Sequence, residues 1–115
     1  MNIAKVCKQI AVYWEAAGND GYGGLSYTEP IEIKVRWRDR FQIILTSDGK
    51  EHQSQAEVWT LIDLKEEGFL YLGRLTSLDS DQLIDPKEIS SAHEIIRFIK
   101  IPALRGNEYI RKVYL

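Results

Sequence analysis

The sequence has one cysteine, three prolines and one methionine among its 115 residues, and it contains no long apolar run. The lone Cys7 cannot form an internal disulfide, which excludes a disulfide-framed secreted mini-protein and fits a chain folded in a reducing compartment. Nowhere do about 18 apolar residues follow one another, and the first residues lack an apolar run of signal-peptide length. We therefore expect synthesis in the cytoplasm, with neither membrane insertion nor export.

Catalytic and metal-binding motifs are also missing. Cys7, His52 and His93 lie far apart in the sequence, without the spacing of metal ligands. The run that begins with Asp79 and Asp81 starts like a calcium loop, but isoleucine and serine stand where glycine and glutamate are needed. Adventitious cation binding there, and a Cys–His pair formed in space, stay open as alternatives. We predict that the chain is not an enzyme and has no catalytic residues, no cofactor and no metal.

Length and overall charge narrow the choice further. A chain of 115 residues and 13.3 kDa is one domain over residues 1–115, and it buries only about two-thirds of its unfolded surface. Such a core is too small to enclose a large substrate cavity, so a large cavity would have to be built between copies. The net charge of -2 argues against a dedicated nucleic-acid binder, which usually carries a basic excess.

Period-2 alternation is the main structural signal. Apolar residues from Ile31 to Trp37 alternate with charged ones, which predicts a strand with one apolar face. Further strands are expected over residues 41–46, 51–61, 69–72, 94–101 and 108–115, with an Asp-Gly turn at Gly49 and a second hairpin closed by residues 66–68. Residues 6–14 are ambiguous between strand and helix, and we favour strand because Val12, Tyr13 and Trp14 are strongly β-prone.

These elements predict an all-β protein. We expect a small antiparallel β-barrel or sandwich of six to seven short strands, with two long loops and at most one short helix. The helix would lie over residues 85–92, where Asp85 can cap it and Pro86 can occupy its first position. Trp14, Trp37 and Trp59 are expected in the core, with a subunit interface as the alternative.

The two long loops, at about 15–30 and 74–91, are where function is expected. Loops of this length inside a small domain are uncommon and usually functional or disordered. The first holds four of the eight glycines, and the second has aspartates among serines and threonines. The candidate channel or partner residues are Gly18, Asp20, Gly21, Tyr22, Gly23, Gly24, Tyr27, Asp79 and Asp81.

Charge is divided unevenly along the chain. Between Asp48 and Glu94 there are eleven acids against four bases, so the rest of the chain is basic. The candidate subunit-interface charges are Lys34, Arg36, Arg38 and Arg40. Such a division suits association of copies through opposite faces, whereas the alternative is a solvated strand face with ordinary cross-strand pairs. A third interpretation, contact with nucleic-acid phosphates, lacks an exposed aromatic platform if Trp37 points inward.

The order of landmark residues resembles that of the head-closure, or stopper, proteins of tailed phages and prophages. The landmarks are Tyr13-Trp14, the glycine-rich run from Gly18 to Gly24, Pro30, Arg36-Trp37, the run from Ala56 to Trp59, Gly68 with Leu70 and Gly73, Asp85-Pro86, the run from Ala92 to Ile95 with Phe98, Pro102, Gly106, and the run from Arg111 to Leu115. The motifs are structural and include no catalytic residue.

The resemblance implies a small β-barrel that forms a ring of six or twelve copies in the virion neck. The ring would lie beneath the portal and its head-tail adaptor, close the DNA channel after packaging, and receive the tail terminator or tail tube proteins. Packaged DNA would lie nearby without sequence-specific binding, and no membrane would be involved. The channel-facing loop would be either 16–29 or 74–91. A tail-completion or adaptor subunit of the same neck is the first alternative, and a small-barrel nucleic-acid-binding protein is the second.

Overall fold

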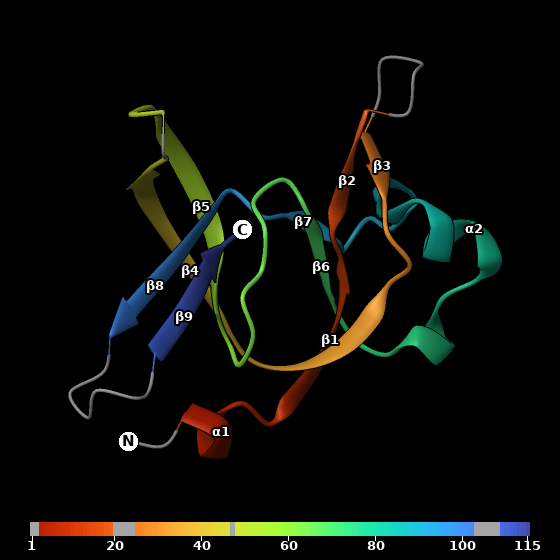
Figure 1. Cartoon of the computed structure of the whole chain (residues 1–115), viewed down its shortest axis with the longest axis horizontal. Coiled ribbons are helices and arrows are strands. Elements are labelled where there is room, and N and C mark those ends of the chain that lie inside the picture. The colour runs from red at the N-terminus through yellow and green to blue at the C-terminus, as the bar shows by residue number, and fades with distance from the viewer. Residues whose placement is uncertain (1–2, 20–24, 47, 103–108) are drawn as a thin grey trace.

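The computed structural model describes residues 3–19, 25–46, 48–102 and 109–115 (Figure 1). Strands make up more than half of the described residues, which confirms the all-β class. They are β1 Gln9–Trp14, β2 Ala16–Asn19, β3 Leu25–Tyr27, β4 Ile31–Leu45, β5 Glu51–Thr60, β6 Phe69–Leu72, β7 His93–Glu94, β8 Arg97–Pro102 and β9 Tyr109–Tyr114. The helices of the described residues are single turns: α1 Ile3–Val6, α2 Ser80–Ile84, and the 3-10 turns η1 Leu75–Ser77 and η2 Pro86–Glu88. The strand favoured over residues 6–14 is confirmed from Gln9 onward.

The seven-stranded sheet has the order β7-β6-β1-β4-β5-β9-β8, and its two outer strands are consecutive segments of the chain. The residues between them bond to both sides. Ile95 N–H donates to the Gly68 carbonyl at 2.7 Å and its carbonyl accepts from Glu67 N–H, while Ile96 N–H donates to the Tyr114 carbonyl at 2.8 Å. The segment 93–102 therefore joins β6 to β9 and closes the sheet into a small antiparallel barrel.

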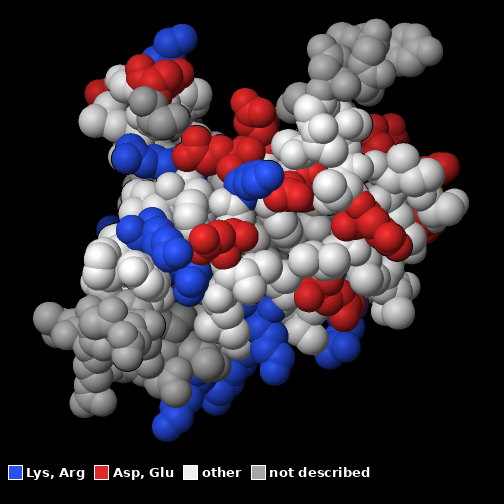
Figure 2. Space-filling view, viewed as in Figure 1, with Lys and Arg blue, Asp and Glu red and all other residues white. Residues whose placement is uncertain are grey.

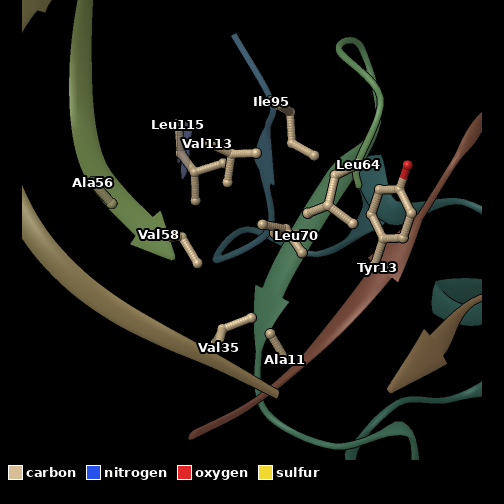
Figure 3. Packing of buried hydrophobic residues seen from close by; sticks show 10 residues of the cluster. All are labelled: Ala11, Tyr13, Val35, Ala56, Val58, Leu64, Leu70, Ile95, Val113 and Leu115. Atoms are coloured by element: carbon tan, nitrogen blue, oxygen red, sulfur yellow. The ribbon is translucent and has the colours of Figure 1, made fainter. Parts of the chain in front are cut away.

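Side chains from β1, β4, β5, β6 and β9, and from residues next to strands, fill the barrel interior (Figure 3). The cluster consists of Ala11, Tyr13, Val35, Ala56, Val58, Leu64, Leu70, Ile95, Val113 and Leu115. Small and large residues alternate along the strands, as expected for a narrow barrel whose lumen is packed by its own side chains. Burying a large aliphatic side chain contributes about 1.5–3 kcal/mol, so this cluster supplies the main stabilisation of the fold.

Strand β1 is buried on both faces, which explains its ambiguous sequence pattern. Ala11 and Tyr13 point into the barrel, whereas Val12 and Trp14 point outward and are covered by a second apolar cluster. That cluster contains Ile89 and the partly buried Tyr27, Phe69, Tyr71, Leu75, Leu78 and Ala92. A strand covered on both faces has no polar side, so its residues form a nearly continuous apolar run.

The second long loop is a packed cover rather than an open connection. The indole N–H of Trp14 donates to the Leu83 carbonyl at 2.9 Å, which holds α2 against β1. Asp79 caps α2 and forms a capping box with Gln82. The helix predicted over 85–92 is replaced by the single 3-10 turn η2, although Asp85 does cap it by accepting from Lys87 N–H at 3.0 Å.

The hairpin predicted around residues 66–68 is wrong. β5 pairs with β4 and β9, whereas β6 pairs with β1 and β7. The connection between β5 and β6 is anchored across the barrel end, because Leu64 is buried in the core and Lys65 N–H donates to the Tyr13 hydroxyl at 2.9 Å. It thus delivers β6 to the far side of the barrel, beside β1.

Strand β4 contains a bulge that changes which side chains face outward. The register with β5 shifts between Asp39 and Gln42, so one extra residue is inserted on β4. Before the bulge Val35 lies in the core, whereas Phe41 within the bulge and Ile43 after it are exposed. The β4–β5 hairpin extends past the barrel as an arm, and Arg97 holds it by donating to the Leu45 carbonyl.

Part of the first predicted loop, 15–30, is a second arm. β2 and β3 pair as a separate two-stranded sheet, with a register shift next to Gly18. Figure 1 shows this arm and the β4–β5 arm projecting from the same end of the barrel. The segment predicted as a long loop from its glycine content is therefore partly a hairpin. Gly18 has φ +102°, a conformation that glycine adopts readily, and it permits the irregular backbone of β2.

Candidate functional site

The predicted basic residues form one row on the outer face of β4. Lys34, Arg36 and Arg38 occupy alternate positions of the strand and are exposed. Their cross-strand neighbours share this face: Arg36 lies opposite Trp59, and Arg38 lies opposite Glu57. Successive members are about 6.8 Å apart along the strand. The structure thus brings three of the four predicted charges together on one strand face, whereas Arg40 lies at the register shift between Asp39 and Gln42.

Trp59 does not belong to the core, contrary to the prediction. It is half-buried on the outer face, with the Arg36 guanidinium 5.4 Å and the Lys112 ammonium 5.2 Å from its ring centroid. Trp14 is fully buried as predicted, and Trp37 is partly buried against the core. The signal that places Trp59 outside is the buried alternation Ser54, Ala56, Val58, Thr60 in β5, because it leaves the odd positions on the other face.

Glu57 is the buried acid at the centre of this basic face. Its side chain is 8% exposed, and it lies 3.3 Å from the Lys112 ammonium and 3.7 Å from the Arg40 guanidinium. The Trp59 indole N–H also donates to it at 3.3 Å. Burial acts to raise the pKa of Glu57, but the hydrogen bonds from Trp59 and Lys112 and the charges of Lys112 and Arg40 outweigh it, so its pKa is lowered.

We expect Glu57→Gln to flatten the acid dependence of stability. A lowered folded-state pKa means that the Glu57 contribution is full above the ordinary glutamate pKa and is lost as the pH falls through the lower, folded value. At neutral pH the variant should lose about 1–3 kcal/mol, because Lys112 and Arg40 lose their carboxylate. Thermal unfolding at neutral and acid pH measures both effects. Asp63→Asn is the matched control, because this carboxylate is 57% exposed and its ion pairs should contribute little.

Acidic side chains of the segment 48–94 form ion pairs with bases of the same subunit. Asp63 pairs with Lys100 at 3.4 Å and with Arg111 at 2.6 Å, and the hydrogen bond from Arg111 lowers its pKa. Among the described residues, four of the five ion pairs join an acid from 48–94 to a base outside it. The interpretation as ordinary cross-strand pairs thus accounts for these charges, whereas Lys34, Arg36 and Arg38 have no ion pair within the described ranges.

An open hollow lies over the basic face, lined by Arg36, Arg38, Arg40, Glu57, Trp59 and Lys112. A second hollow, beside the β4–β5 arm, is acidic: Asp48, Glu66, Glu67 and Glu94 line it together with Thr46, His52, Ile95 and Ile96. Figure 2 shows acidic side chains mainly over the upper part and around α2, and basic side chains along the left and lower edges. One subunit thus presents regions of opposite charge.

Large apolar side chains continue the outer face of β4 from the bulge onward. Phe41, Ile43 and Leu45 are 69%, 71% and 55% exposed, and we call them the apolar strip. Ser54 opposite Gln42 is buried, so the strip lies on the other, outer side of the arm. Sequence reasoning missed this surface, because the apolar residues of 41–46 indicate a strand without showing that a bulge precedes it.

The predicted channel or partner residues that the structure describes do not form one group. Tyr27 belongs to the second apolar cluster, where its ring packs edge-on to Phe69 at 5.5 Å and burial raises its pKa. Asp79 serves as the cap of α2, Asp81 is exposed on that helix, and Gly18 lies in β2. The predicted residues Asp20, Gly21, Tyr22, Gly23 and Gly24 lie outside the described residues.

Two of the groups considered for catalysis or metal binding, Cys7 and His93, contact tryptophans. The buried Cys7 thiol donates to the Trp59 carbonyl at 3.6 Å, and burial raises its pKa. The His93 ring lies 6.3 Å from that of Trp37. In the described part of the chain, no three His, Cys, Asp or Glu side chains gather as a metal site. No helix in the same ranges is both long and apolar enough to cross a bilayer.

Comparisons with protein-family models, with curated proteins and with solved structures find no match to this chain.

Proposed function

We propose that this chain is a structural subunit of the neck of a tailed phage or prophage, a head-closure protein that assembles as a ring. The positions of the landmark residues support this. Trp14 and Pro86 are buried, and a Cβ at Gly68 would lie 2.5 Å from the Trp14 carbonyl oxygen. Three of the residues that carry the resemblance therefore hold the barrel and its cover together, so a protein that shares them is expected to share this architecture.

The observation that carries the proposal is the apolar strip. Three adjacent large apolar side chains, all more than half exposed, form a face of the β4–β5 arm. Water contact with such a face costs free energy, and contiguous apolar surface of this kind typically marks an interface with another protein. The strip adjoins the basic row of β4, so the surface offers apolar contact together with charges that orient a partner.

In the proposed assembly the small barrel is a repeated wall element. A ring of six or twelve copies encloses the axial cavity that one barrel cannot form. Lys34, Arg36, Arg38 and Arg40 are interface charges that meet the acidic surface of a neighbouring copy. The two arms project from one end of the barrel, where they are available to the head-tail adaptor ring, to the tail terminator or tail tube proteins, or to the channel.

One observation favours a second candidate, a nucleic-acid-binding small barrel. Trp59 lies on the outer face between Arg36 and Lys112, so the basic row does have an adjacent aromatic ring. Both flanking cations already contact this ring, however, and a base could stack on it only by displacing one of them. We therefore rank this function second.

The proposal is tested by locating the protein in the virion. Antibody labelling and single-particle imaging of the encoding phage should place it in an axial ring at the head-tail junction. Particles without it should package DNA, lose it again and fail to attach tails. Packaged, DNA-retaining heads would instead indicate a tail-completion role.

Absence from any axial ring would contradict the neck proposal. Binding of a DNA duplex with a salt dependence that shrinks when Lys34, Arg36, Arg38 and Arg40 are all changed to alanine would then favour the second candidate.

A further inference from the structure

Two exposed apolar surfaces lie at opposite ends of the molecule and differ in the charge around them. The apolar strip is on the β4–β5 arm, next to the exposed Arg38 of the basic row. The other surface centres on Ile84, the last residue of α2, whose 75% exposure is the highest among the large apolar residues described. Figure 1 shows the arm and α2 at opposite sides along the longest axis, which measures 44 Å.

The surface around Ile84 is acidic and held in place by the fold. Asp81, Asp85 and Glu88 line a shallow hollow with Ile84. The preceding residue, Leu83, accepts the buried Trp14 indole N–H, so the backbone that presents Ile84 is fixed to β1. An isoleucine held rigidly in water, with acids around it, has the composition of an interface centre with a charged rim.

We propose that copies of this chain associate head to tail, with the apolar strip of one copy seated on the acid-rimmed Ile84 of the next. Each surface supplies what the other lacks, because apolar atoms meet apolar atoms and Arg38 faces the acids of the neighbouring rim. The two surfaces do not overlap, so each copy can use both at once, and such a heterologous contact generates a ring when the rotation from one copy to the next closes. This inference rests on the proposed ring and identifies its interface.

The competing contact, strip against strip, is disfavoured by charge. A two-fold dimer would bring the Arg36 and Arg38 rows of both copies close together, and the described residues give these arginines no carboxylate partner. Like charges placed opposite each other in an interface oppose association. The acidic rim around Ile84 removes that repulsion, which is why we choose the head-to-tail pair.

Two half-disabled variants test the contact. Phe41→Asp with Ile43→Asp removes the strip, and Ile84→Asp removes its receiving surface. Neither variant alone should assemble at concentrations where the unchanged chain forms rings, because its dissociation constant should rise about tenfold or more. Mixed in equal amounts, they should form a 1:1 dimer, since each retains the surface that the other lacks. Analytical ultracentrifugation measures all three samples, and Ile101→Asp, at an exposed position on β8, is the control that should assemble normally.

Charge-reversal variants and a cysteine crosslink test the same contact by other means. Arg38→Glu should weaken assembly, and adding Asp81→Arg and Glu88→Arg should restore it. A variant with Cys7→Ser, Ile43→Cys and Ile84→Cys should give a ladder of covalent oligomers with a short bismaleimide. Unchanged thermal unfolding midpoints establish that the variants fold.

The outcomes separate this interface from the ring itself. If the unchanged chain forms axial rings that survive both half-disabled variants, the interface is wrong and the proposed function stands. If only the strip variant loses assembly, the copies meet strip to strip and the head-to-tail contact is overturned. A concentrated sample with neither oligomers nor a crosslinked ladder overturns the interface, whereas absence of the protein from the virion neck overturns the function.

Discussion

Trp14→Ala should lower the free energy of unfolding by about 3–5 kcal/mol, the range for removing a large buried aromatic side chain. Trp14 is fully buried, lies between the barrel and its outer cover, and donates its indole N–H to the Leu83 carbonyl at 2.9 Å. Natural domains have only about 5–15 kcal/mol of stability, so the variant should approach the limit of folding. Urea unfolding followed by circular dichroism measures the loss.

Two further substitutions separate the contributions of Trp14. Trp14→Phe keeps most of the apolar contact but leaves the Leu83 carbonyl without its donor, so it should cost about 1–3 kcal/mol. It should also increase hydrogen exchange in α2 and the two 3-10 turns more than in β4 and β5. Trp59→Ala is the surface comparison, because Trp59 is half-buried on the outer face. Equal losses for Trp14→Ala and Trp59→Ala would contradict the assigned roles.

Local signals were sufficient to predict two of the hairpins, β4–β5 and β8–β9. Alternation from Ile31 to Trp37, the Asp-Gly turn at Gly49 and the β-prone run after Glu51 predict β4 and β5, and these strands do pair. The two C-terminal runs likewise pair as β8 and β9. In each case the partner strand is the next one along the chain, so sequence neighbours also become neighbours in the sheet.

Pairing between distant segments could not be predicted in this way. β6 looks like the partner of β5, yet it lies beside β1 because Leu64 and Lys65 carry the connection across the barrel end. Closure through Ile95 depends on hydrogen bonds to β6 on one side and β9 on the other. Such choices are decided by the packing of the whole core, which no single window of the sequence contains.

Only the part of the candidate site that lies on a single strand could be predicted, because contacts between strands depend on their register. Alternation places Lys34, Arg36 and Arg38 on one face, and the structure confirms this. It does not reveal that Glu57 would be buried beneath them, because that contact depends on the register between β4 and β5. Nor does it reveal the apolar strip: one inserted residue reverses the side on which every later side chain lies.

The bulge thus connects the fold to the proposed assembly. Without it, the odd-numbered positions that place Val35 in the core would continue inward through Ile43. With it, the same period-2 pattern directs apolar side chains to the core before the bulge and to the outer face after it. A strand can in this way stabilise its own subunit with one half and offer an interface with the other.

Gly68→Ala should be the most disruptive single-methyl change in the described part of the chain. A Cβ at Gly68 would lie 2.5 Å from the Trp14 carbonyl oxygen and 3.1 Å from the Tyr13 ring. A backbone oxygen cannot move aside as a side chain can, so β1 and the start of β6 must separate. The Gly68 carbonyl also accepts from Ile95 N–H at the point where the barrel closes. We expect a loss of about 3 kcal/mol, the upper end for overpacking in a core.

Gly49→Ala is the control for the glycine substitution itself. Gly49 has φ +82°, and no atom lies within 4 Å of the place that a Cβ would occupy, so the added methyl costs only the left-handed backbone conformation, about 1 kcal/mol. In urea unfolding, the free energy of unfolding of Gly68→Ala should therefore be well below that of Gly49→Ala. Hydrogen exchange should increase at Ile95 and Ile96 only in the Gly68 variant, because that substitution opens the barrel seam. Equal stability of the two variants would mean that the contact between residue 68 and β1 tolerates a side chain. Barrel closure would then not depend on the close approach of β1 to residue 68.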